Sequence, residues 1–388
     1  MPLPPLPTLT DYALVGGGLQ NALLALAIRH HQPDAQIVLV ERAPRLGGNH
    51  TWCLHDGDVP PATMVWLEPL LAHRWPGYEV AFPDLRRRVA LGYAAATSER
   101  LHTTVLAAVA RGPGAVWLNA EAVDVGAQQV ALADGRRLQA KVVVSALGPE
   151  RAALPAGTGW QKFVGLELVT AAPHGLREPI LMDARVPQDG GFRFVYTLPL
   201  DAHRLLVEDT CFADDPVLDV AAMRDAVLRY AATRGWQVAR IAREERGVLP
   251  MPWSRPPPLD DNGPLLGGMQ GGWFHPATGY SLAIGAQLAQ CVASAPPEDA
   301  RGQGLVRLRE QHEAKAHFAR KLNWALFRLA APADRVAMMA RFYQRPEDVI
   351  QRFYALDLHL SDQLRIVLGR PPRKMRWWPR NQGQETRT

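Results

Sequence analysis

Cysteine is scarce in this sequence. Only three occur in 388 residues, at Cys53, Cys211 and Cys291. No two of them have the short CxxC spacing of zinc or redox sites, and so few cannot form a disulfide framework. We therefore expect no metal site and a reducing, cytoplasmic compartment.

Long hydrophobic runs are also missing. No stretch reaches the roughly 18 to 20 consecutive apolar residues that a membrane-spanning helix needs. The first ten residues, MPLPPLPTLT, have no basic region followed by an apolar run, so we expect no signal peptide. These absences leave a protein that is either soluble or bound to the surface of a membrane.

Hydrophobic residues, in contrast, make up 47% of the chain, enough to bury a sizeable core. The length predicts two interlocked domains. The charge is uneven: from residue 301 onward there are 18 lysines and arginines against eight acidic residues. Such a basic region suits anionic lipid, nucleic acid or simply a solvated helical face. Because we find no helix-turn-helix pattern, zinc site or RNA-recognition motif, we expect no nucleic-acid partner.

The beginning of the chain has the pattern of a βαβ unit. Residues 11–16 (DYALVG) and 36–41 (QIVLVE) are predicted to be buried strands, and residues 19–31 (LQNALLALAIRHH) a helix between them. The three elements fit within about 30 residues, which is the length of such a unit.

A glycine motif lies where the first strand meets the helix. Gly16, Gly17 and Gly18 open the pattern GxGxxG, with Asn21 in place of the third glycine. Gly16 permits the tight turn, Gly18 lets the backbone approach a pyrophosphate, and the helix N-terminus favours the phosphate charge. Asn21 predicts looser packing of helix on strand. Glu41 ends the second strand, where an acid can hold ribose hydroxyls. The motif predicts a dinucleotide site; the alternative is a glycine-rich turn in a fold that has lost its ligand.

Two further glycine segments favour FAD over NAD. Gly47 and Gly48 follow the acid directly, as in FAD enzymes of the glutathione-reductase and hydroxylase type. Residues 271–280 (GGWFHPATGY) predict a turn of small residues against a flavin ring, with Pro276, Thr278 and Gly279 as contacts. The Gly-Asp pair that usually precedes this turn is absent from residues 268–271 (GMQG), which puts ribityl contacts there in doubt.

The remaining pattern predicts a second sheet and a helical end. Strands are expected at 115–125, 128–133, 137–144 with its continuation 141–148, 179–184, 191–199 and 203–210, a helix at 216–234, a proline-rich loop at 250–264, strand, glycine turn and helix over 272–293, and helices from about 302. Asp134-Gly135 is a hairpin signal, and Gly148 ends a buried strand in small residues.

Several segments together resemble the bacterial lycopene beta-cyclases over most of the chain. They are residues 47–52 (GGNHTW), 73–78 (HRWPGY), 82–83 (FP), 192–196 (FRFVY), 206–210 (LVEDT), 247–250 (GVLP) and 275–281 (HPATGYS). The resemblance implies an α/β fold in which a Rossmann-type FAD-binding domain is interleaved with a β-sheet substrate domain, followed by a helical C-terminal region. It implies closure of β-rings at the ends of lycopene, an isomerisation that needs reduced FAD without net redox change, with NAD(P)H reducing the flavin.

On this basis we predict a discontinuous FAD-binding domain of residues 8–150 and 245–295. Residues 60–95 and 151–244 would form the substrate domain, 296–375 a helical region in contact with the membrane, and 376–388 a tail. Arg100, which opens a helix, would reach the FAD pyrophosphate as in hydroxylase-like folds; a surface salt bridge is the alternative.

Ring closure begins with a proton added to an alkene, so a carboxylic acid in a dry pocket is required. The resemblance points to Glu208 in the acidic motif LVEDT. Burial on an apolar strand would raise its pKa and keep it protonated; a surface glutamate before a turn is the alternative. Asp209 would point to the opposite face of the strand, where it would support Glu208 indirectly or have a structural role. Asp183 is a further acid candidate that could face the same cavity, with Arg193 as a structural partner. A lone histidine such as His275 is more often simply packed.

Lycopene lives in the bilayer, which implies a peripheral protein on the cytoplasmic side of the inner membrane, in reach of other carotenoid enzymes. Residues 316–330, 341–343, 352–354 and 373–378 interleave basic and aromatic side chains as membrane surfaces favour; the same positions could equally be core. The rival hypotheses are an FAD-dependent monooxygenase, a polyprenyl reductase, and a non-catalytic carotenoid or flavin carrier.

Overall fold

A parallel sheet forms one half of the molecule. The computed structural model describes residues 9–148, 157–256 and 262–368. The sheet consists of β8 (Gly114–Trp117), β2 (Ile37–Val40), β1 (Thr10–Val15) and β11 (Arg137–Ser145) in that order, with β17 (Leu265–Leu266) beside β11. In chain order this is 3-2-1-4-5, the arrangement of doubly wound dinucleotide-binding folds. Ligands of such folds bind beyond the carboxyl ends of the strands, where β1 runs into the glycine motif.

The βαβ prediction is confirmed. β1, α1 (Leu19–His31) and β2 follow the predicted boundaries within a residue. α1 is apolar almost all round because the helices α3 (Ser98–Val109) and α5 (Leu282–Ala293) pack on it in one core cluster. The Asp134-Gly135 hairpin is also confirmed, since β10 (Gln129–Leu132) pairs antiparallel with β11.

The single strand predicted over residues 115–125 is wrong. The chain leaves the parallel sheet after β8 and re-enters it at the other edge as β9 (Ala122–Val125), antiparallel to β10. Asn119, between them, has a φ of 56°, a left-handed conformation that ends an extended strand. The alternating pattern continued through this turn, so alternation alone did not locate it.

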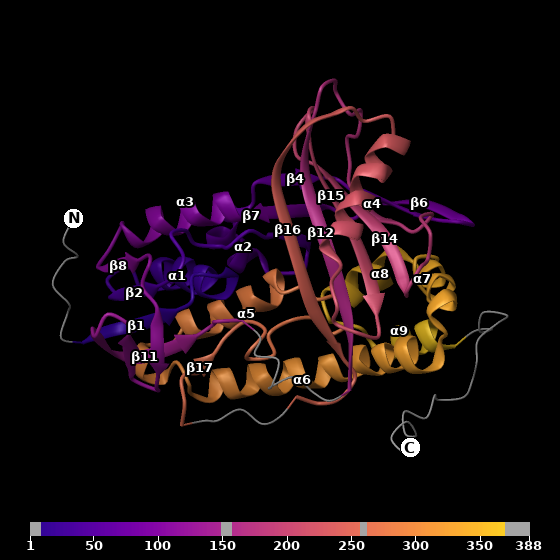
Figure 1. Cartoon of the computed structure of the whole chain (residues 1–388). Coiled ribbons are helices and arrows are strands. Elements are labelled where there is room, and N and C mark those ends of the chain that lie inside the picture. The colour runs from indigo at the N-terminus through magenta and orange to yellow at the C-terminus, as the bar shows by residue number, and fades with distance from the viewer. Residues whose placement is uncertain (1–8, 149–156, 257–261, 369–388) are drawn as a thin grey trace, which may run out of the picture.

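A larger, mostly antiparallel sheet stands against the first half, as the tall arrows of Figure 1 show. Its order is β16 (Val238–Pro252), β12 (Thr158–Thr170), β15 (Arg204–Ala213), β14 (Phe192–Pro199), β13 (Ile180–Asp183), β5 (Tyr78–Phe82) and β6 (Leu85–Val89). The helix α4 (Val220–Thr233) covers one face. The strands expected at 179–184, 191–199 and 203–210 and the helix at 216–234 are confirmed. β12 and β16, the two longest strands, were not predicted.

Residues 60–95 are divided between the two halves. The helix α2 (Pro61–Leu67) and the short helix η1 (Glu68–Leu70) pack in the core cluster around α1. β5 and β6 instead join the large sheet, and β4 (His73–Trp75) forms a small sheet with β7 (Tyr93–Thr97) and β3 (Thr51–His55). The boundary expected at residue 245 falls inside β16. The division into domains therefore stays a prediction at these two places.

The C-terminal third is helical, as predicted. It comprises α5, α6 (Gln303–Trp324), a π-helical turn η4 (Ala325–Leu329), α7 (Arg335–Phe342), α8 (Glu347–Tyr354) and α9 (Leu360–Val367), with short helices η3 (Pro297–Asp299) and η5 (Pro332–Asp334). In Figure 1, α6 runs beneath both halves and joins them to α7–α9. The strand expected at the start of 272–293 is wrong, because these residues form consecutive turns before α5.

No helix in the described part of the chain is long and apolar enough to cross a membrane. The basic and aromatic residues 373–378 and the tail 376–388 lie outside the described residues. Arg335 ties the helical region to the large sheet: it is fully buried and donates to the backbone oxygens of Phe212 (3.1 Å) and Leu326 (3.2 Å).

The looser packing expected at Asn21 is not found. Asn21 is fully buried, and its Nδ2 donates to the backbone oxygens of Val15 and Gly16, both at 2.8 Å. The amide thus satisfies two carbonyls at the end of β1 that a third glycine could not reach, and it fastens α1 to the turn.

We expect Asn21→Ala to lower the free energy of unfolding by about 2 kcal/mol, because the carbonyls of Val15 and Gly16 each lose the hydrogen bond from the amide, and only Val15 keeps another, from the amide of Ala146. Urea unfolding followed by circular dichroism measures the change. Gln311→Ala, at an exposed position of α6, serves as the control and should change stability by less than about 0.5 kcal/mol. Equal stability of both variants would show that the Asn21 amide does not fasten the helix.

Candidate active site

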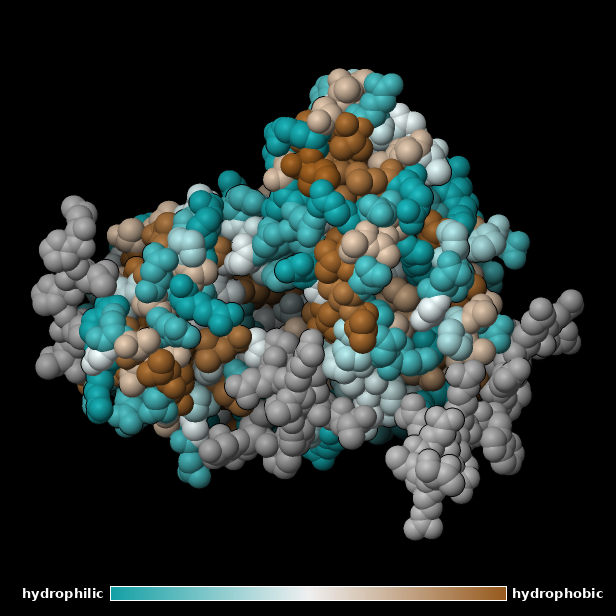
Figure 2. Space-filling view, viewed as in Figure 1, coloured by the Kyte–Doolittle hydropathy of each residue, from teal (hydrophilic) through white to brown (hydrophobic). Residues whose placement is uncertain are grey.

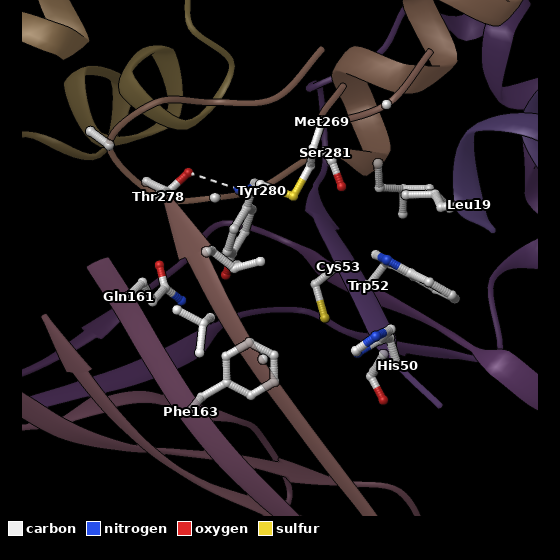
Figure 3. A pocket seen from close by; sticks show the side chains of 18 of the residues that line it. Leu19, His50, Trp52, Cys53, Gln161, Phe163, Met269, Thr278, Tyr280 and Ser281 are labelled. Carbon is white, nitrogen blue, oxygen red and sulfur yellow. Dashed lines mark hydrogen bonds between the residues drawn. The ribbon is translucent and has the colours of Figure 1, made fainter. Parts of the chain in front are cut away.

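One cavity of about 1000 Å³ connects the two halves of the molecule. It begins at the glycine motif, passes between the turns before α5 and the large sheet, and ends among the C-terminal helices. Figure 3 shows its middle part, where Gln161 and Phe163 of β12 lie opposite Trp52 and Cys53 of β3. Its lining residues come from the parallel sheet, the large sheet and the C-terminal helices, and they divide the cavity into three parts.

The first part is a backbone cradle at the carboxyl ends of β1 and β2. Gly16 has a φ of 95°, and a Cβ there would lie 2.6 Å from the backbone oxygen of Ala146, so only glycine fits. A Cβ on Gly18 would meet nothing within 4 Å, because it would project into the cavity. α1 begins at Leu19 with no side-chain cap. Its first amides and its dipole therefore remain directed at an anionic ligand.

Glu41 stands at the edge of this cradle, as predicted. Its carboxylate lines the cavity and accepts hydrogen bonds from the backbone amides of Gly17 (2.6 Å) and Ala43 (2.7 Å). These bonds fix an acceptor pair next to the glycine turn. Such a pair suits the two hydroxyls of a ribose.

The other predicted cofactor residues divide into two groups. Gly47, Gly48, Gly148, Thr278 and Gly279 all line the cavity. The first two have φ angles of 83° and 55°, which glycine adopts readily, and the amide of Gly47 bonds the carbonyl oxygen of Gly17 at 2.8 Å. The glycine pair after the acid thus packs directly against the cradle.

Pro276 and Arg100 are not among the cavity-lining residues. The carbonyl oxygen of Pro276 accepts from Asn323 Nδ2 at 2.8 Å. Arg100 is exposed, and its Nε donates to the carbonyl oxygen of Pro69 at 2.9 Å. The expected contact of Arg100 with a pyrophosphate is therefore wrong for this structure. Its position on α3 directs it along the surface toward η1.

Sequence reasoning missed three parts of the cradle. Arg42, next to Glu41, lines the cavity and offers a cation. Gly267 and Gly268 line it as well, and a Cβ on Gly267 would collide with Gln20 at 2.8 Å. The glycine pair was the available signal in the sequence, but residues 268–271 (GMQG) lack the aspartate that usually accompanies it.

The second part of the cavity contains the predicted acid. Glu208 of β15 lines the cavity and accepts a hydrogen bond at Oε1 from the hydroxyl of Thr210 at 2.7 Å. Burial, and after it the negative charge of Glu245, raises the pKa of the Glu208 carboxyl to about 8. The group is consequently protonated near neutral pH and available as an acid.

Glu245 of β16 is a second cavity-lining carboxyl that sequence reasoning missed. It is 3% exposed, and its Oε2 accepts from Arg243 Nη1 (2.7 Å) and from the hydroxyl of Thr51 (3.2 Å). Burial raises the pKa of Glu245, while Arg243 opposes that shift. In the sequence it sits in the run REER, which looks like an exposed strand. The residues around Glu245 show no apolar alternation that would have predicted its burial.

Asp209 points away from the cavity, as strand alternation predicted. It is 1% exposed and forms a bidentate pair with Arg193, with Nε at 2.8 Å and Nη2 at 2.7 Å. The hydrogen bond to Asp209 raises the pKa of the Arg193 guanidinium. The pair therefore links β14 to β15 on the α4 side of the sheet, where it does not reach the cavity.

Asp183 is not in the cavity either. Its neighbours Leu181 and Met182 line the cavity, whereas its own carboxylate accepts from Arg185 (2.8 and 2.6 Å) and from the hydroxyl of Tyr230 (2.9 Å). Burial alone would raise the pKa of Asp183, but these hydrogen bonds outweigh it and the pKa is lowered. The partner expected for Asp183 was Arg193, and that expectation is wrong, because Arg193 is bound by Asp209.

His275 is a packed histidine, which was the alternative preferred for it. It is fully buried; Nδ1 accepts from the amide of Ala277 at 3.1 Å, and Nε2 lies 2.8 Å from the carbonyl oxygen of Phe353. Since Nδ1 accepts, Nε2 carries the proton and donates. Burial lowers the pKa of His275 to about 4, so the ring is neutral. It joins the turn before α5 to α8.

Phenol side chains form the wall between the acid and the turn before α5. Tyr93 bonds both Tyr196 (2.9 Å) and Tyr280 (2.6 Å), and Tyr196 also contacts Cys53 Sγ at 3.1 Å. Burial raises the pKa of the Cys53 thiol to about 12 and those of the three phenols well above their usual value. All four groups therefore stay neutral. The wall offers aromatic faces without charge, which suits a cationic intermediate.

The third part of the cavity belongs to the C-terminal helices and is mostly apolar, although Arg341 and Arg345 also line it. Its lining includes Leu322, Leu326, Leu329, Met338, Met339, Phe342, Phe353, Ile366 and Val367. Most apolar side chains of 316–330 and 341–354 thus face the cavity or the core rather than the surface, with Tyr343 fully buried and Phe353 8% exposed. Core packing, the alternative that remained open for these helices, accounts for them.

The arrangement can donate a proton in a dry, aromatic-walled space that a long hydrocarbon can enter from the helical end. A neutral carboxylic acid, a second carboxyl group held by arginine, and a backbone cradle for a dinucleotide all open into it. No group of three or more metal-ligating side chains occurs among the described residues.

The raised pKa of Glu208 predicts how stability depends on pH. An acid whose pKa is about 8 when folded, against a usual 4.5, stabilises the fold fully below about pH 4.5 and loses that contribution as the pH rises through 8. Glu208→Gln cannot ionise. The free energy of unfolding of the wild type should therefore fall, relative to this variant, by on the order of a few kcal/mol between pH 5 and pH 8. Urea unfolding at several pH values measures it, and parallel pH curves would contradict the raised pKa.

Comparison with known proteins agrees with this architecture. A family model described as "Lycopene cyclase protein" matches residues 11–377. The lycopene beta-cyclase of Pseudescherichia vulneris is 43% identical over 93% of this chain and 94% of its own; that of Pantoea ananas is 40% identical over 93% and 95%.

Solved structures share the fold at much lower identity. A geranylgeranyl bacteriochlorophyll reductase-like protein of Thermoplasma acidophilum aligns with a TM-score of 0.63 and 13% identity over 92% of this chain and 96% of its own. The flavin-dependent brominase Bmp2 aligns with a TM-score of 0.63 and 12% identity over 90% and 94%. The fold is therefore one that flavin-dependent enzymes use.

Proposed function

The chain belongs to the lycopene cyclase family, and we propose that it is a lycopene beta-cyclase that closes β-rings at the ends of lycopene. The reaction is an isomerisation: a proton is added to a terminal alkene, an internal double bond attacks the resulting tertiary cation, and a proton is lost. The observation that carries the proposal is the cavity wall at Glu208, where a carboxyl with a pKa of about 8 faces an apolar space. Products with one ring or two, γ-carotene and β-carotene, both follow from this chemistry.

Glu208 is the proton donor in this proposal. Thr210 donates to Oε1, so Oε1 is the carbonyl oxygen and the acid proton sits on Oε2. The neutral phenols of Tyr196 and Tyr280 line the cavity, exclude water and present aromatic faces, and Tyr93 bonds both of them. Asp209 and Asp183 support the sheet from the other side through Arg193 and Arg185. They take no part in proton transfer.

We propose FAD as the cofactor, bound in the backbone cradle. The cradle fits a dinucleotide because Gly16 and Gly267 admit no Cβ, and Gly18 leaves open space. Glu41 would hold the ribose, the start of α1 the pyrophosphate, and the turn with Thr278 and Gly279 the flavin end. Reduced FAD would supply negative charge that stabilises the cation, with no net transfer of electrons. NAD(P)H is the proposed reductant of the flavin, on the strength of the family.

The rival flavoenzymes share the fold but differ in product mass. A monooxygenase adds oxygen and a polyprenyl reductase adds hydrogen, whereas a cyclase leaves the mass unchanged. A protonated carboxyl in the middle part of the cavity favours the cyclase, because flavin hydroxylation needs no acid there. A carotenoid or flavin carrier would need neither the acid nor its raised pKa.

The test is an anaerobic assay of the purified protein with lycopene in liposomes and FAD either oxidised or reduced by dithionite, NADH or NADPH. We expect a product of unchanged mass and shorter absorption wavelength only with reduced FAD. Glu208→Gln should lower the rate at least 1000-fold while flavin binding is kept, because the variant has no acid proton to give. The wild-type rate should fall as the pH rises through about 8, as Glu208 ionises.

Glu244→Gln is the matched control for this assay. Glu244 pairs with Arg224 and is not among the cavity-lining residues. Its variant should retain the wild-type rate within about threefold. A product heavier by oxygen or hydrogen would move the assignment to the monooxygenase or reductase. Full activity of Glu208→Gln would exclude Glu208 as the acid.

We further propose that the protein binds the cytoplasmic surface of the inner membrane through α9. Leu360, Leu364, Val367 and Leu368 are 58–78% exposed and recur at helical spacing on one face. Ile366 and Val367 also line the cavity, so its apolar end opens beside this face. On the side shown in Figure 2, hydrophobic residues lie in groups between hydrophilic ones. A hydrocarbon could pass from the acyl chains into the cavity at α9.

Leu360→Asp with Leu364→Asp should lower the fraction bound to anionic vesicles at least tenfold, because each buried leucine contributes about 1.5–3 kcal/mol to insertion. Flotation on a density gradient measures it. Val123→Asp, at a position 63% exposed on β9, is the control and should bind like the wild type. Cyclisation of lycopene in detergent micelles should remain in the double variant. Unchanged flotation would show that α9 is not the membrane face.

A further inference from the structure

Two carboxyl groups face the cavity from strands on either side of one glycine. Glu208 of β15 and Glu245 of β16 both lie directly opposite Gly165 of β12 in the strand register. Residues directly opposite one another in a sheet project from the same face. The row Glu208, Gly165, Glu245 therefore presents two carboxyls with no side chain between them.

Gly165 is required by space and not by backbone conformation, because its φ lies outside the left-handed region. A Cβ at Gly165 would lie 3.0 Å from Cγ and 3.3 Å from Oε1 of Glu245. The Glu245 side chain thus occupies the space above the glycine, where the same Cβ would also lie 3.3 Å from Leu206 Cδ1. Any larger residue at Gly165 would separate the two carboxyls.

The two carboxyls have unequal partners. Arg243 and Thr51 both donate to Oε2 of Glu245, while Oε1 lies over Gly165. Arg243 is in turn 3.1 Å from Glu167, which is itself paired with Arg204. Glu208, in contrast, accepts from the neutral hydroxyl of Thr210.

Like charges in one buried site do not both ionise readily, and the charge stays where a cation stabilises it. Arg243 therefore selects Glu245 as the carboxylate of the pair, and Glu208 retains the proton. One member of the pair is an acid and the other a base before any substrate enters.

We propose that Glu245 is the base that removes the ring proton at the end of cyclisation and returns it to Glu208 across Gly165. This inference rests on the proposed cyclase function. The carbon that gains a proton and the carbon that loses one are different atoms of the new ring, so a separate acid and base serve both without movement of the substrate.

The steps balance in atoms and electrons. The O–H bond of Glu208 breaks and a C–H bond forms at the terminal alkene. The internal double bond then forms the ring C–C bond, which leaves a cation on the ring. The ring C–H bond breaks, its electron pair becomes the ring double bond, and the proton goes to Oε1 of Glu245. Transfer of that proton to Glu208 restores the starting state, with no proton or electron gained or lost.

The test compares Glu245→Gln and Glu208→Gln in D₂O at a pD near 6, where Glu208 is protonated both in the wild type and in Glu245→Gln. We expect Glu245→Gln to form β-rings at least 100-fold more slowly than the wild type. Because its acid still protonates the alkene, unreacted lycopene should gain deuterium, or rings with a displaced double bond should appear. Glu208→Gln should give neither product nor deuterium. Mass spectrometry and NMR of the recovered carotenoids read both signals.

Glu244→Gln, the neighbour on β16, is the control and should resemble the wild type. β-Ring formation by Glu245→Gln within threefold of the wild-type rate would overturn the proposal. So would a folded, flavin-binding Glu245→Gln that is inert without deuterium uptake, since Glu245 would then only support the acid. A wild type that does not cyclise lycopene would instead refute the function on which the inference rests.

Gly165→Ala provides a second variant that retains both carboxyls. Its methyl group would displace Glu245 from above β12, so β-ring formation should fall at least tenfold with deuterium uptake retained. Wild-type behaviour of Gly165→Ala would show that the two carboxyls need no close approach, and would overturn the return of the proton across this position.

Discussion

The structure depends on keeping one carboxylic acid dry and protonated beside a hydrocarbon. Burial raises the pKa of Glu208 because the charged form loses its water, and the carboxylate of Glu245 adds to the effect. The next residue, Asp209, is 1% exposed and has Arg193 within 2.8 Å. Successive residues of a strand face opposite sides, so one pair of adjacent acids yields a proton donor on one face and an ion pair on the other.

The requirements of the acid shape the rest of the cavity. The buried charges beside the acid have partners, as Arg243 has Glu245 and Glu167, and Tyr196, opposite Glu208 in the sheet, stays neutral. The backbone cradle supplies its polar groups as amides, which stabilise an anion without adding side-chain charge. The apolar helices line the far end, with Phe342 and Met339 among the lining residues. An unpaired charge anywhere along this path would compete for the proton and would itself be costly to bury.

The parts that could be predicted from sequence are those that local physics determines. The βαβ unit, the cradle at Gly16 to Gly18 and the hairpin at Gly135 follow from glycine conformation and strand periodicity, and Glu208 from the resemblance. The strands β12 and β16 were not predicted because Glu167 and Glu245 interrupt their apolar alternation. Both glutamates are buried in ion pairs, Glu167 with Arg204 and Arg243, and Glu245 with Arg243. Arg100 was misplaced because the direction of α3 is set by its packing on α1, which no local pattern reports. The burial of these glutamates and the position of Arg100 are both set by residues distant in the chain.

A fold shared at 12–13% identity with a reductase-like protein and a flavin-dependent brominase says little about the reaction, since such folds host many chemistries. What distinguishes this chain is the wall of the large sheet facing the flavin cradle. If that wall carried only Glu208, the acid would become a carboxylate after donating its proton and would have to recover one from solvent through an apolar cavity. A second carboxylate over Gly165 removes that need, because the proton lost by the ring is already beside the group that must regain it. An isomerase that exchanges no proton with solvent during turnover can then work in an apolar cavity that excludes water.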